Sequence, residues 1–217
     1  GSEDPDLVPG WQGWMFILEV GEQPKRITDD TLNPVGGFHP FTPAADFRWT
    51  SGGDIIFIGD RHGQSYLCSV NVDTEEIRMV SGGNISYSSV GFNREATQAV
   101  LAASSPTSAS ELEIVAVGEG SNRQITTSNS RIFKEVDSPQ QAKFIVRRGR
   151  FEIECRLYTP PGLDSSIPHP LILDIHGGPH GVFSDSFNLL QQVLVSAGYI
   201  VLCVNPRGSS TYGADFA

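Results

Sequence analysis

A glycine-rich loop between an apolar run and a helical pattern carries the strongest chemical signal in the sequence. It reads His176-Gly177-Gly178-Pro179 and follows the almost continuously apolar run 170–175. Consecutive glycines let a backbone approach a ligand closely, and N–H groups near a helix N-terminus point toward developing negative charge. Such a loop can build an oxyanion hole for acyl transfer. A tight turn that needs glycine only for its shape is the alternative, but the strand before the loop and the helix after it favour the chemical interpretation.

A second loop with polar side chains, 205–213, follows the next apolar run, where α/β sheets place their ligands. Its sequence is Asn-Pro-Arg-Gly-Ser-Ser-Thr-Tyr-Gly. Arg207 in this loop can bind a carboxylate with two hydrogen bonds, or it can anchor its own loop through a salt bridge. Strand-end loops with Pro and Gly favour the anchor. Arg207 is therefore a candidate substrate-binding residue with a structural alternative.

The five histidines show no spacing that would assemble a metal site. His176 directly ends the apolar run and has no serine or carboxylate assigned to it, which favours a packing or hydrogen-bonding role over general-base catalysis. His180 is expected to face solvent. The other three stand singly in turn-like stretches: His39, His62 and His169. We predict neither a metal nor a cofactor.

The elements that must position the two loops form a strand, helix, strand unit. The run 170–175 is expected to be a strand buried on both faces, and 199–204 is a second apolar strand. Between them, apolar residues recur at helical spacing over 183–197, and Gly198 stands where the helix would end. This order predicts the right-handed parallel crossover of an α/β domain, preceded by a hairpin over 143–158.

The first part of the chain contains an internal repeat of strand-like segments. Three times an apolar run and a polar turn lead to a basic residue, any residue, Ile or Val, and then Ser or Thr; the basic residues are Lys25, Arg78 and Arg123. Hairpins are expected over 54–72 and 97–117. A period of about 40–45 residues with several short strands is typical of β-propeller blades, and an ordinary β-sandwich with similar hairpins is the alternative.

Near residue 137 the sequence changes from repeated short strand-like segments to a pattern of strands and a helix, and a linker is expected over 127–142. We predict that residues 1–137 form a partial β-propeller of about three blades, too few to close a ring. Residues 138–217 are then the N-terminal part of an α/β-hydrolase domain. The predicted fold class is mixed, with β-propeller blades followed by an α/β part.

Composition excludes several other classes of protein. The net charge of −10, from 15 basic and 25 acidic residues, with no basic stripe, makes nucleic-acid binding and attachment to anionic membranes unfavourable. No window approaches the roughly 18 apolar residues of a membrane span. The three cysteines each sit in an apolar run and are expected to be buried thiols, which favours a cytoplasmic protein: Cys68, Cys155 and Cys203.

The order of these features resembles the prolyl oligopeptidase family of serine peptidases, and within it the acylaminoacyl-peptidase-like branch. The motifs that carry the resemblance are the segments 171–180 and 205–213, and the match is tight over 140–217 and loose before that. The resemblance implies a propeller that gates access to an α/β-hydrolase domain, which cleaves short peptides with a Ser, Asp, His triad. It also implies that the backbone N–H of Gly178 is an oxyanion donor and that Gly177 shapes the loop.

The chain departs from that family pattern because it contains no Gly-x-Ser-x-Gly motif, which would place a nucleophilic serine on a sharp strand-to-helix turn. The nearest sequence, 208–212, lacks the closing glycine. We therefore predict serine peptidase action through an acyl-enzyme for the parent protein and no activity for this chain alone.

Several alternatives and partners remain open from the sequence. A companion chain produced by a nick near Ala217 could carry the Ser, Asp and His of the triad, and a homo-oligomer is compatible with the sequence. The alternatives to a peptidase are an esterase of the α/β-hydrolase class and a non-catalytic binding fragment based on propeller blades.

Overall fold

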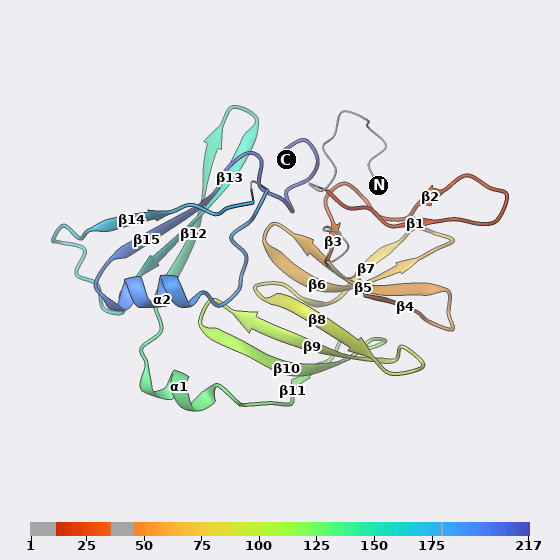
Figure 1. Ribbon diagram of the computed structural model, residues 1–217, viewed down its shortest axis with the longest axis horizontal. Coiled ribbons are helices and arrows are strands. Elements are labelled where there is room, and N and C mark those ends of the chain that lie inside the picture. The colour runs from red at the N-terminus through yellow and green to blue at the C-terminus, as the bar shows by residue number, and fades with distance from the viewer. Residues whose placement is uncertain (1–11, 36–45, 179) are drawn as a thin grey trace.

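The structure is a computed structural model that describes residues 12–35, 46–178 and 180–217. Within these ranges the chain is mostly β, with antiparallel sheets in its N-terminal part and a mixed sheet with one short helix in its C-terminal part (Figure 1). The two parts lie side by side, and the C-terminal loop sits above their junction in this view.

The N-terminal part consists of two larger antiparallel sheets and a two-stranded ribbon. The ribbon is β1 (Phe16–Ile17) and β2 (Lys25–Arg26). The first sheet is β3 (Asn33–Pro34), β4 (Phe47–Trp49), β5 (Asp54–Arg61), β6 (Gln64–Asn71) and β7 (Ile77–Gly82). The second sheet is β8 (Ser86–Phe92), β9 (Gln98–Ser105), β10 (Ser108–Ala116) and β11 (Asn122–Gln124).

The repeat seen in the sequence marks the same place in each of the three N-terminal sheets. Its basic residues lie in the last strand of the ribbon and of each sheet: Lys25 in β2, Arg78 in β7 and Arg123 in β11. The expected hairpins are present as β5–β6 and β9–β10. The β5–β6 turn is His62-Gly63, and both residues have positive φ, which suits a tight two-residue connection.

The first sheet is buried on both faces. One face shares a core with the second sheet, built from residues such as Ile56, Leu67 and Leu101. The other face packs Phe57 and Val70 with Ile27 and neighbouring residues of the ribbon region. This double burial explains why Ile55–Ile58 is a continuous apolar run rather than an alternating one.

The C-terminal part is a mixed sheet in the order β12-β13-β15-β14. Its elements are β12 (Gln140–Arg148), β13 (Phe151–Thr159), β14 (Leu171–Asp174), α2 (Leu189–Ser196) and β15 (Ile200–Asn205). Strands β14 and β15 are parallel, as the strand, helix, strand pattern predicts, and β12–β13 is the expected antiparallel hairpin. Tyr158, Val195, Val201 and Cys203 form the core beneath α2.

Two details of this part differ from the sequence-based expectation. Strand β14 is not buried on both faces, because it is the edge strand of the described sheet, and Leu171 and Leu173 are about half exposed. Helix α2 begins at Leu189, where the side chain of Asn188 caps the N–H of Gln191, so residues 183–188 are not helical.

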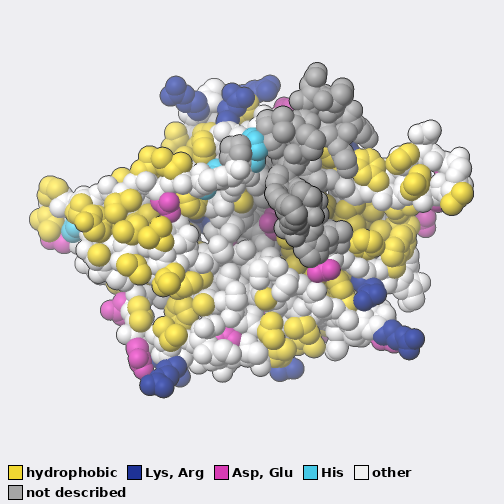
Figure 2. Space-filling view, viewed as in Figure 1, with side chains coloured by type: hydrophobic (Ala, Val, Ile, Leu, Met, Phe, Trp, Pro, Cys, Tyr) yellow, Lys and Arg dark blue, Asp and Glu magenta, His cyan; other side chains and the backbone are white. Residues whose placement is uncertain are grey.

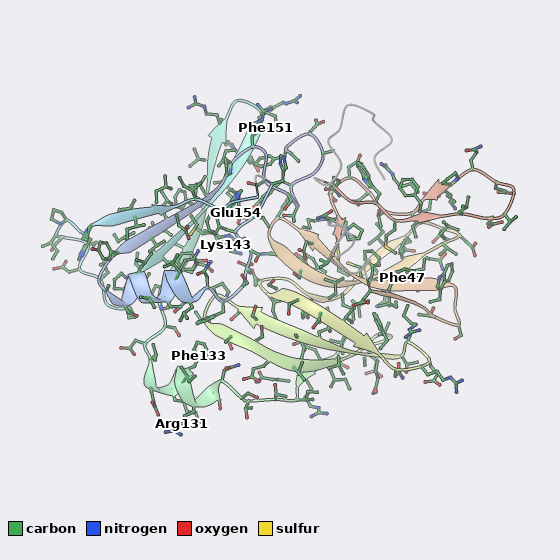
Figure 3. The ribbon with its side chains drawn as sticks, viewed as in Figure 1. Phe47, Arg131, Phe133, Lys143, Phe151 and Glu154 are labelled. Atoms are coloured by element: carbon green, nitrogen blue, oxygen red, sulfur yellow. The ribbon has the colours of Figure 1, made fainter. Side chains whose placement is uncertain are left out.

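The expected linker over 127–142 contains a short helix, α1 (Ser130–Glu135), and the start of β12. The helix lies below the mixed sheet, and Phe133 points toward the rest of the molecule while Arg131 points away (Figure 3). Phe133 packs edge-on against Phe187, with ring centroids 5.2 Å apart. The linker is therefore tied to the segment before α2.

The three cysteines are free thiols and are buried, as expected. Burial raises the pKa of the Cys68 and Cys203 thiols to about 12 and also raises that of Cys155. Among the described residues, no helix has the length and apolar character that crossing a membrane requires.

Candidate active site

The glycine loop, residues 176–181, leaves the carboxyl end of β14 as a tight turn. The N–H of Gly181 donates to the carbonyl of Gly177 at 3.1 Å. Gly178 has a φ of +141°, and a Cβ atom at this position would lie 2.4 Å from the nitrogen of Gly181. Only glycine fits there. Gly177 borders open space, since a Cβ atom on it would meet nothing within 4 Å. Pro179 lies outside the described residues.

The loop does not stand at a helix N-terminus, as the sequence suggested, because α2 begins only at Leu189. A helix dipole therefore does not contribute at Gly177 and Gly178. Any stabilisation of negative charge at this place has to come from individual backbone N–H groups held in position by neighbouring segments.

The arginine loop, residues 205–213, holds the glycine loop directly. The Nε2 atom of His176 lies 2.9 Å from the hydroxyl of Ser209, and Nδ1 of His180 lies 2.7 Å from the carbonyl of Gly208. The N–H of Ser210 also donates to the carbonyl of Gly181 at 3.4 Å. The two motifs singled out in the sequence thus form one site.

These contacts assign roles to two histidines. His176 hydrogen-bonds the neighbouring loop through the hydroxyl of Ser209, which is fully buried. The expectation of a solvent-facing His180 is wrong: the ring is partly buried and contacts the arginine loop. Sequence reasoning missed Ser209, which lies 33 residues after its partner. His39 lies outside the described residues.

A buried amide joins the arginine loop to the segment that follows the glycine loop. The Oδ1 atom of Asn205 accepts the N–H of Phe183 at 2.8 Å. Its Nδ2 atom donates to the Phe183 carbonyl at 3.0 Å and to the Tyr212 hydroxyl at 2.9 Å. Asn205 is almost completely buried, and its position at the end of an apolar strand was the only signal for it in the sequence.

The β5–β6 turn of the N-terminal part contacts both segments. The N–H of His62 donates to the Thr211 carbonyl at 2.8 Å, and that of Gly63 donates to the Thr211 hydroxyl at 2.9 Å. The carbonyl of Gly63 accepts the N–H of Asp185 at 2.8 Å. The His62 ring stacks on Tyr212, and burial lowers the pKa of His62, so the stacked ring is neutral at pH 7.

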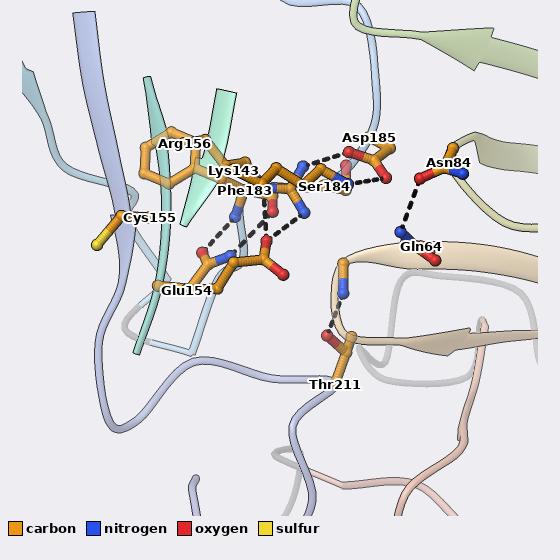
Figure 4. A network of polar contacts seen from close by, with 12 residues as sticks. Gln64, Asn84, Lys143, Glu154, Cys155, Arg156, Phe183, Ser184, Asp185 and Thr211 are labelled. Carbon is orange, nitrogen blue, oxygen red and sulfur yellow. Dashed lines mark hydrogen bonds and ion pairs between the residues drawn. The ribbon is translucent and has the colours of Figure 1, made fainter. Parts of the chain in front are cut away.

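A network of four charged side chains lies beneath this junction (Figure 4). The fully buried guanidinium of Arg156 lies 2.8 Å from Asp185 through Nη1 and 2.7 Å from Glu154 through Nε. Lys143 reaches the second oxygen of Asp185 at 2.5 Å. Burial would lower the pKa of Arg156, but the carboxylates of Glu154 and Asp185 raise it overall, so the guanidinium stays charged. Two cations and two anions balance each other.

Arg207 is anchored differently from the salt bridge that the sequence suggested. Its guanidinium carbon lies 4.4 Å from the centre of the Phe151 ring, and Arg150 contacts the same ring at 4.9 Å. Arg207 forms no ion pair with any residue of the described ranges, and its side chain is exposed. The stacked contact leaves its hydrogen-bond donors open to solvent.

A pocket of about 430 Å³ lies on the other side of the arginine loop, between that loop, the β12–β13 hairpin and the β5–β6 turn. Its walls combine aromatic rings with carboxylates, and it is large enough for a small organic group. The lining residues are His62, Ile145, Arg150, Phe151, Glu152, Glu154, Tyr212, Asp215 and Phe216.

Comparison with curated proteins finds peptidases. The uncharacterized peptidase YuxL of Bacillus subtilis is 31% identical over 119 residues, which are 54% of this chain and 18% of the relative. Dipeptidyl-peptidase 5 of Arthroderma otae is 26% identical over 176 residues, 76% of this chain and 24% of the relative. The chain thus spans about a fifth to a quarter of the length of these relatives. No family model matches it.

Solved structures share the fold. Acylaminoacyl peptidase of Pyrococcus horikoshii superposes with a TM-score of 0.80 at 23% identity, over all of this chain and 32% of that one. Dipeptidyl peptidase 4 of Porphyromonas gingivalis gives 0.67 at 15% identity, over 88% of this chain and 27% of that one. The similarity seen in the sequence motifs therefore extends to the mostly-β architecture.

The peptidase relatives and the shared fold confirm the resemblance that the two loop motifs suggested. This chain is a homologue of a segment of curated peptidases, and it shares the fold of a segment of acylaminoacyl peptidase.

Proposed function

We propose that this chain is the part of a serine peptidase that supplies the oxyanion-hole loop for hydrolysis of short peptides, including acylaminoacyl or oligopeptide substrates. In this proposal a serine of the parent protein attacks the peptide carbonyl and forms an acyl-enzyme. The N–H of Gly178 stabilises the negatively charged oxygen, and Gly177 leaves room beside it.

The observation that carries the proposal is the way the glycine loop is held. An oxyanion hole works only when its donors are fixed before the reaction begins. The contacts of His176 with Ser209 and of His180 with Gly208 fix both ends of the loop, while the space next to Gly177 stays open.

Two other parts of the proposal concern the rest of the parent protein. Residues 1–137 would be blades of a propeller that gates access, and 138–217 would begin the hydrolase domain. The free thiols favour a cytoplasmic location for the whole protein. Arg207, with its donors exposed at the edge of the arginine loop, would bind a substrate carboxylate.

The triad residues would come from a later segment of the parent protein or from a companion chain docked on the mixed sheet. Strand β14 supports this arrangement because it is an edge strand with half-exposed Leu171 and Leu173. A further parallel strand at this edge would cover both side chains and pair the backbone of β14.

The test compares Gly178→Ala with Gly162→Ala in the full-length protein that contains this chain. Both positions have positive φ, but a Cβ atom on Gly162 meets nothing within 4 Å, whereas one on Gly178 displaces the loop. We expect Gly178→Ala to lower kcat by about 10²–10³-fold and Gly162→Ala to leave it close to wild type. A fluorophosphonate probe, which tags activated serines, should label the full-length protein and not the isolated chain.

Wild-type turnover by a folded Gly178→Ala protein would contradict the role of the glycine loop. A full-length protein that the probe does not label would contradict serine catalysis altogether. Hydrolysis of simple esters without any cleavage of peptides would identify the parent as an esterase instead.

A further inference from the structure

Thr211 in the arginine loop has a backbone conformation that its side chain disfavours. Its φ is +71°, in the left-handed region that glycine adopts readily and β-branched residues rarely adopt. The residue is also buried, with 2% of its surface exposed. A strained, buried threonine persists only where its surroundings impose the conformation, and such strain concentrates at functional sites.

The contacts of Thr211 show what imposes it. Its carbonyl accepts the N–H of His62 at 2.8 Å, and its hydroxyl accepts the N–H of Gly63 at 2.9 Å. Both donors belong to the β5–β6 turn of the N-terminal part. A glycine at 211 would relieve the backbone strain but would lose the hydroxyl. The threonine therefore accepts a strained φ in return for a hydrogen bond between the two parts of the molecule.

The turn on the other side is equally constrained. A Cβ atom on Gly63 would lie 2.6 Å from Nη2 of Arg156 and 2.8 Å from the carbonyl oxygen of Phe183. The turn therefore sits directly on the buried ion network, and its carbonyl also holds the N–H of Asp185. One two-residue turn contacts the arginine loop through Thr211 and the segment after the glycine loop through Asp185.

From Thr211 the path to the glycine loop is short. The preceding residues of the arginine loop, Gly208, Ser209 and Ser210, make the contacts with His180, His176 and Gly181. A shift of the arginine loop would therefore move His176, His180 and Gly181, which it contacts. Small displacements of groups that stabilise a transition state are costly in rate, even when binding is preserved.

We propose that Thr211 is a positioning residue for the peptidase reaction, through which docking of the β5–β6 turn sets the geometry of the glycine loop. The inference rests on the proposed function for its catalytic consequence. The coupling between the turn and the glycine loop is a structural claim, and it can be tested without measuring activity.

The experiment uses the full-length protein that contains this chain and three variants at the contact. Thr211→Gly removes the strain and the hydroxyl together, and Thr211→Ser keeps the hydroxyl. Gly63→Ala displaces the β5–β6 turn, because its methyl group would meet Arg156 and the Phe183 carbonyl. Gly162→Ala is the matched control, because its φ of +69° resembles the +65° of Gly63 but no atom lies within 4 Å of the added Cβ.

We expect Thr211→Gly and Gly63→Ala each to lower kcat and the rate of fluorophosphonate labelling by roughly 10- to 100-fold, with KM within about twofold. Thr211→Ser should retain activity within about threefold, because it keeps the hydroxyl that accepts the Gly63 N–H. Amide hydrogen exchange across 174–183 should accelerate by at least about tenfold in the two impaired variants and not in Gly162→Ala.

Each outcome bears on a separate claim. Wild-type kcat and unchanged exchange in Thr211→Gly would overturn the inference while leaving the proposed function intact. Loss of activity in Thr211→Ser equal to that in Thr211→Gly, with a similar fall in melting temperature, would reduce Thr211 to a structural role. If the wild-type protein shows no peptidase activity, the proposed function fails, and the exchange data alone decide whether the coupling exists.

Discussion

The buried amide of Asn205 ties the arginine loop to the segment that follows the glycine loop. It satisfies both the N–H and the carbonyl of Phe183 and holds the Tyr212 hydroxyl as well. An aspartate of the same shape has no donor to offer, and an alanine offers nothing. Buried backbone groups left without partners cost far more than the hydrogen bonds themselves contribute.

Replacing Asn205 with alanine should lower the free energy of unfolding by about 2–4 kcal/mol, because the partly buried N–H and carbonyl of Phe183 both lose their partner. Urea unfolding measures the effect. Asn122→Ala, at an exposed position in β11, is the control and should change the stability by less than about 0.5 kcal/mol. Equal effects of the two substitutions would contradict the role of the Asn205 amide.

Asp60 gives the N-terminal part a dependence on pH. Burial raises the pKa of its carboxyl to about 6, although the Ser65 hydroxyl donates to it at 2.7 Å. The folded state therefore holds a proton that the unfolded chain releases near pH 4. The stability that this carboxyl contributes is greatest below pH 4 and declines as the pH rises to about 6, by up to about 3 kcal/mol.

Asp60→Asn should remove that decline, so the stability of the variant relative to wild type rises between pH 4 and pH 7. Asp29→Asn is a control of opposite sign. Burial would raise the pKa of Asp29, but hydrogen bonds from Thr31 and Leu32 and the charge of Arg61 lower it overall. Its variant should lose stability relative to wild type as the pH rises to about 4 and stay level from there to pH 7, because the lowered pKa confines the effect to pH values below the ordinary pKa of 3.8. A pH-independent difference for Asp60→Asn would refute the assignment.

At the scale of secondary-structure elements, the Arg156 network joins β12, β13 and the segment before α2. Lys143 comes from β12, Arg156 and Glu154 from β13, and Asp185 from the segment. Replacing Arg156 with methionine leaves buried carboxylates with one cation fewer and should cost about 3–5 kcal/mol. Urea unfolding should show that adding Asp185→Asn costs less than the sum of the two single changes. Additive losses would show that the pair is not coupled.

The sequence predicts the elements that depend on local patterns, but not those that depend on contacts between distant residues. The hairpins and the parallel strand pair follow from local alternation, apolar runs and turn residues, and all are present. The late start of α2 could not be inferred, because Phe183 and Phe187 have helical spacing. Hydrogen bonds between Asn205 and Phe183 and between Arg156 and Asp185 hold this segment outside the helix. Likewise, the spacing of the glycine loop and the arginine loop did not reveal the contact of His176 with Ser209.

At the scale of the whole molecule, apolar side chains gather on one end of the C-terminal part, over β14 and α2 (Figure 2). Leu171, Leu173, Leu189, Leu190 and Val193 are each more than half exposed. An exposed parallel edge strand beside such a patch is a template for association with other chains.

The isolated chain should therefore self-associate through this end. Leu173→Lys should shift it toward the monomer in sedimentation velocity, since a charged residue on an edge strand opposes pairing. Leu18→Lys, at an exposed leucine of the N-terminal part, is the control and should leave association unchanged. The same distribution of species for both variants would rule out the β14 end as the contact.

The burial of the three thiols gives the two parts of the molecule separate chemical reporters. Cys68 lies in the core of the first sheet, whereas Cys155 and Cys203 lie in the mixed sheet. Thiolate is the reactive species, and burial suppresses both its formation and its access to reagent. The order in which an alkylating reagent modifies these cysteines during unfolding thus records which part opens first, without any engineered label.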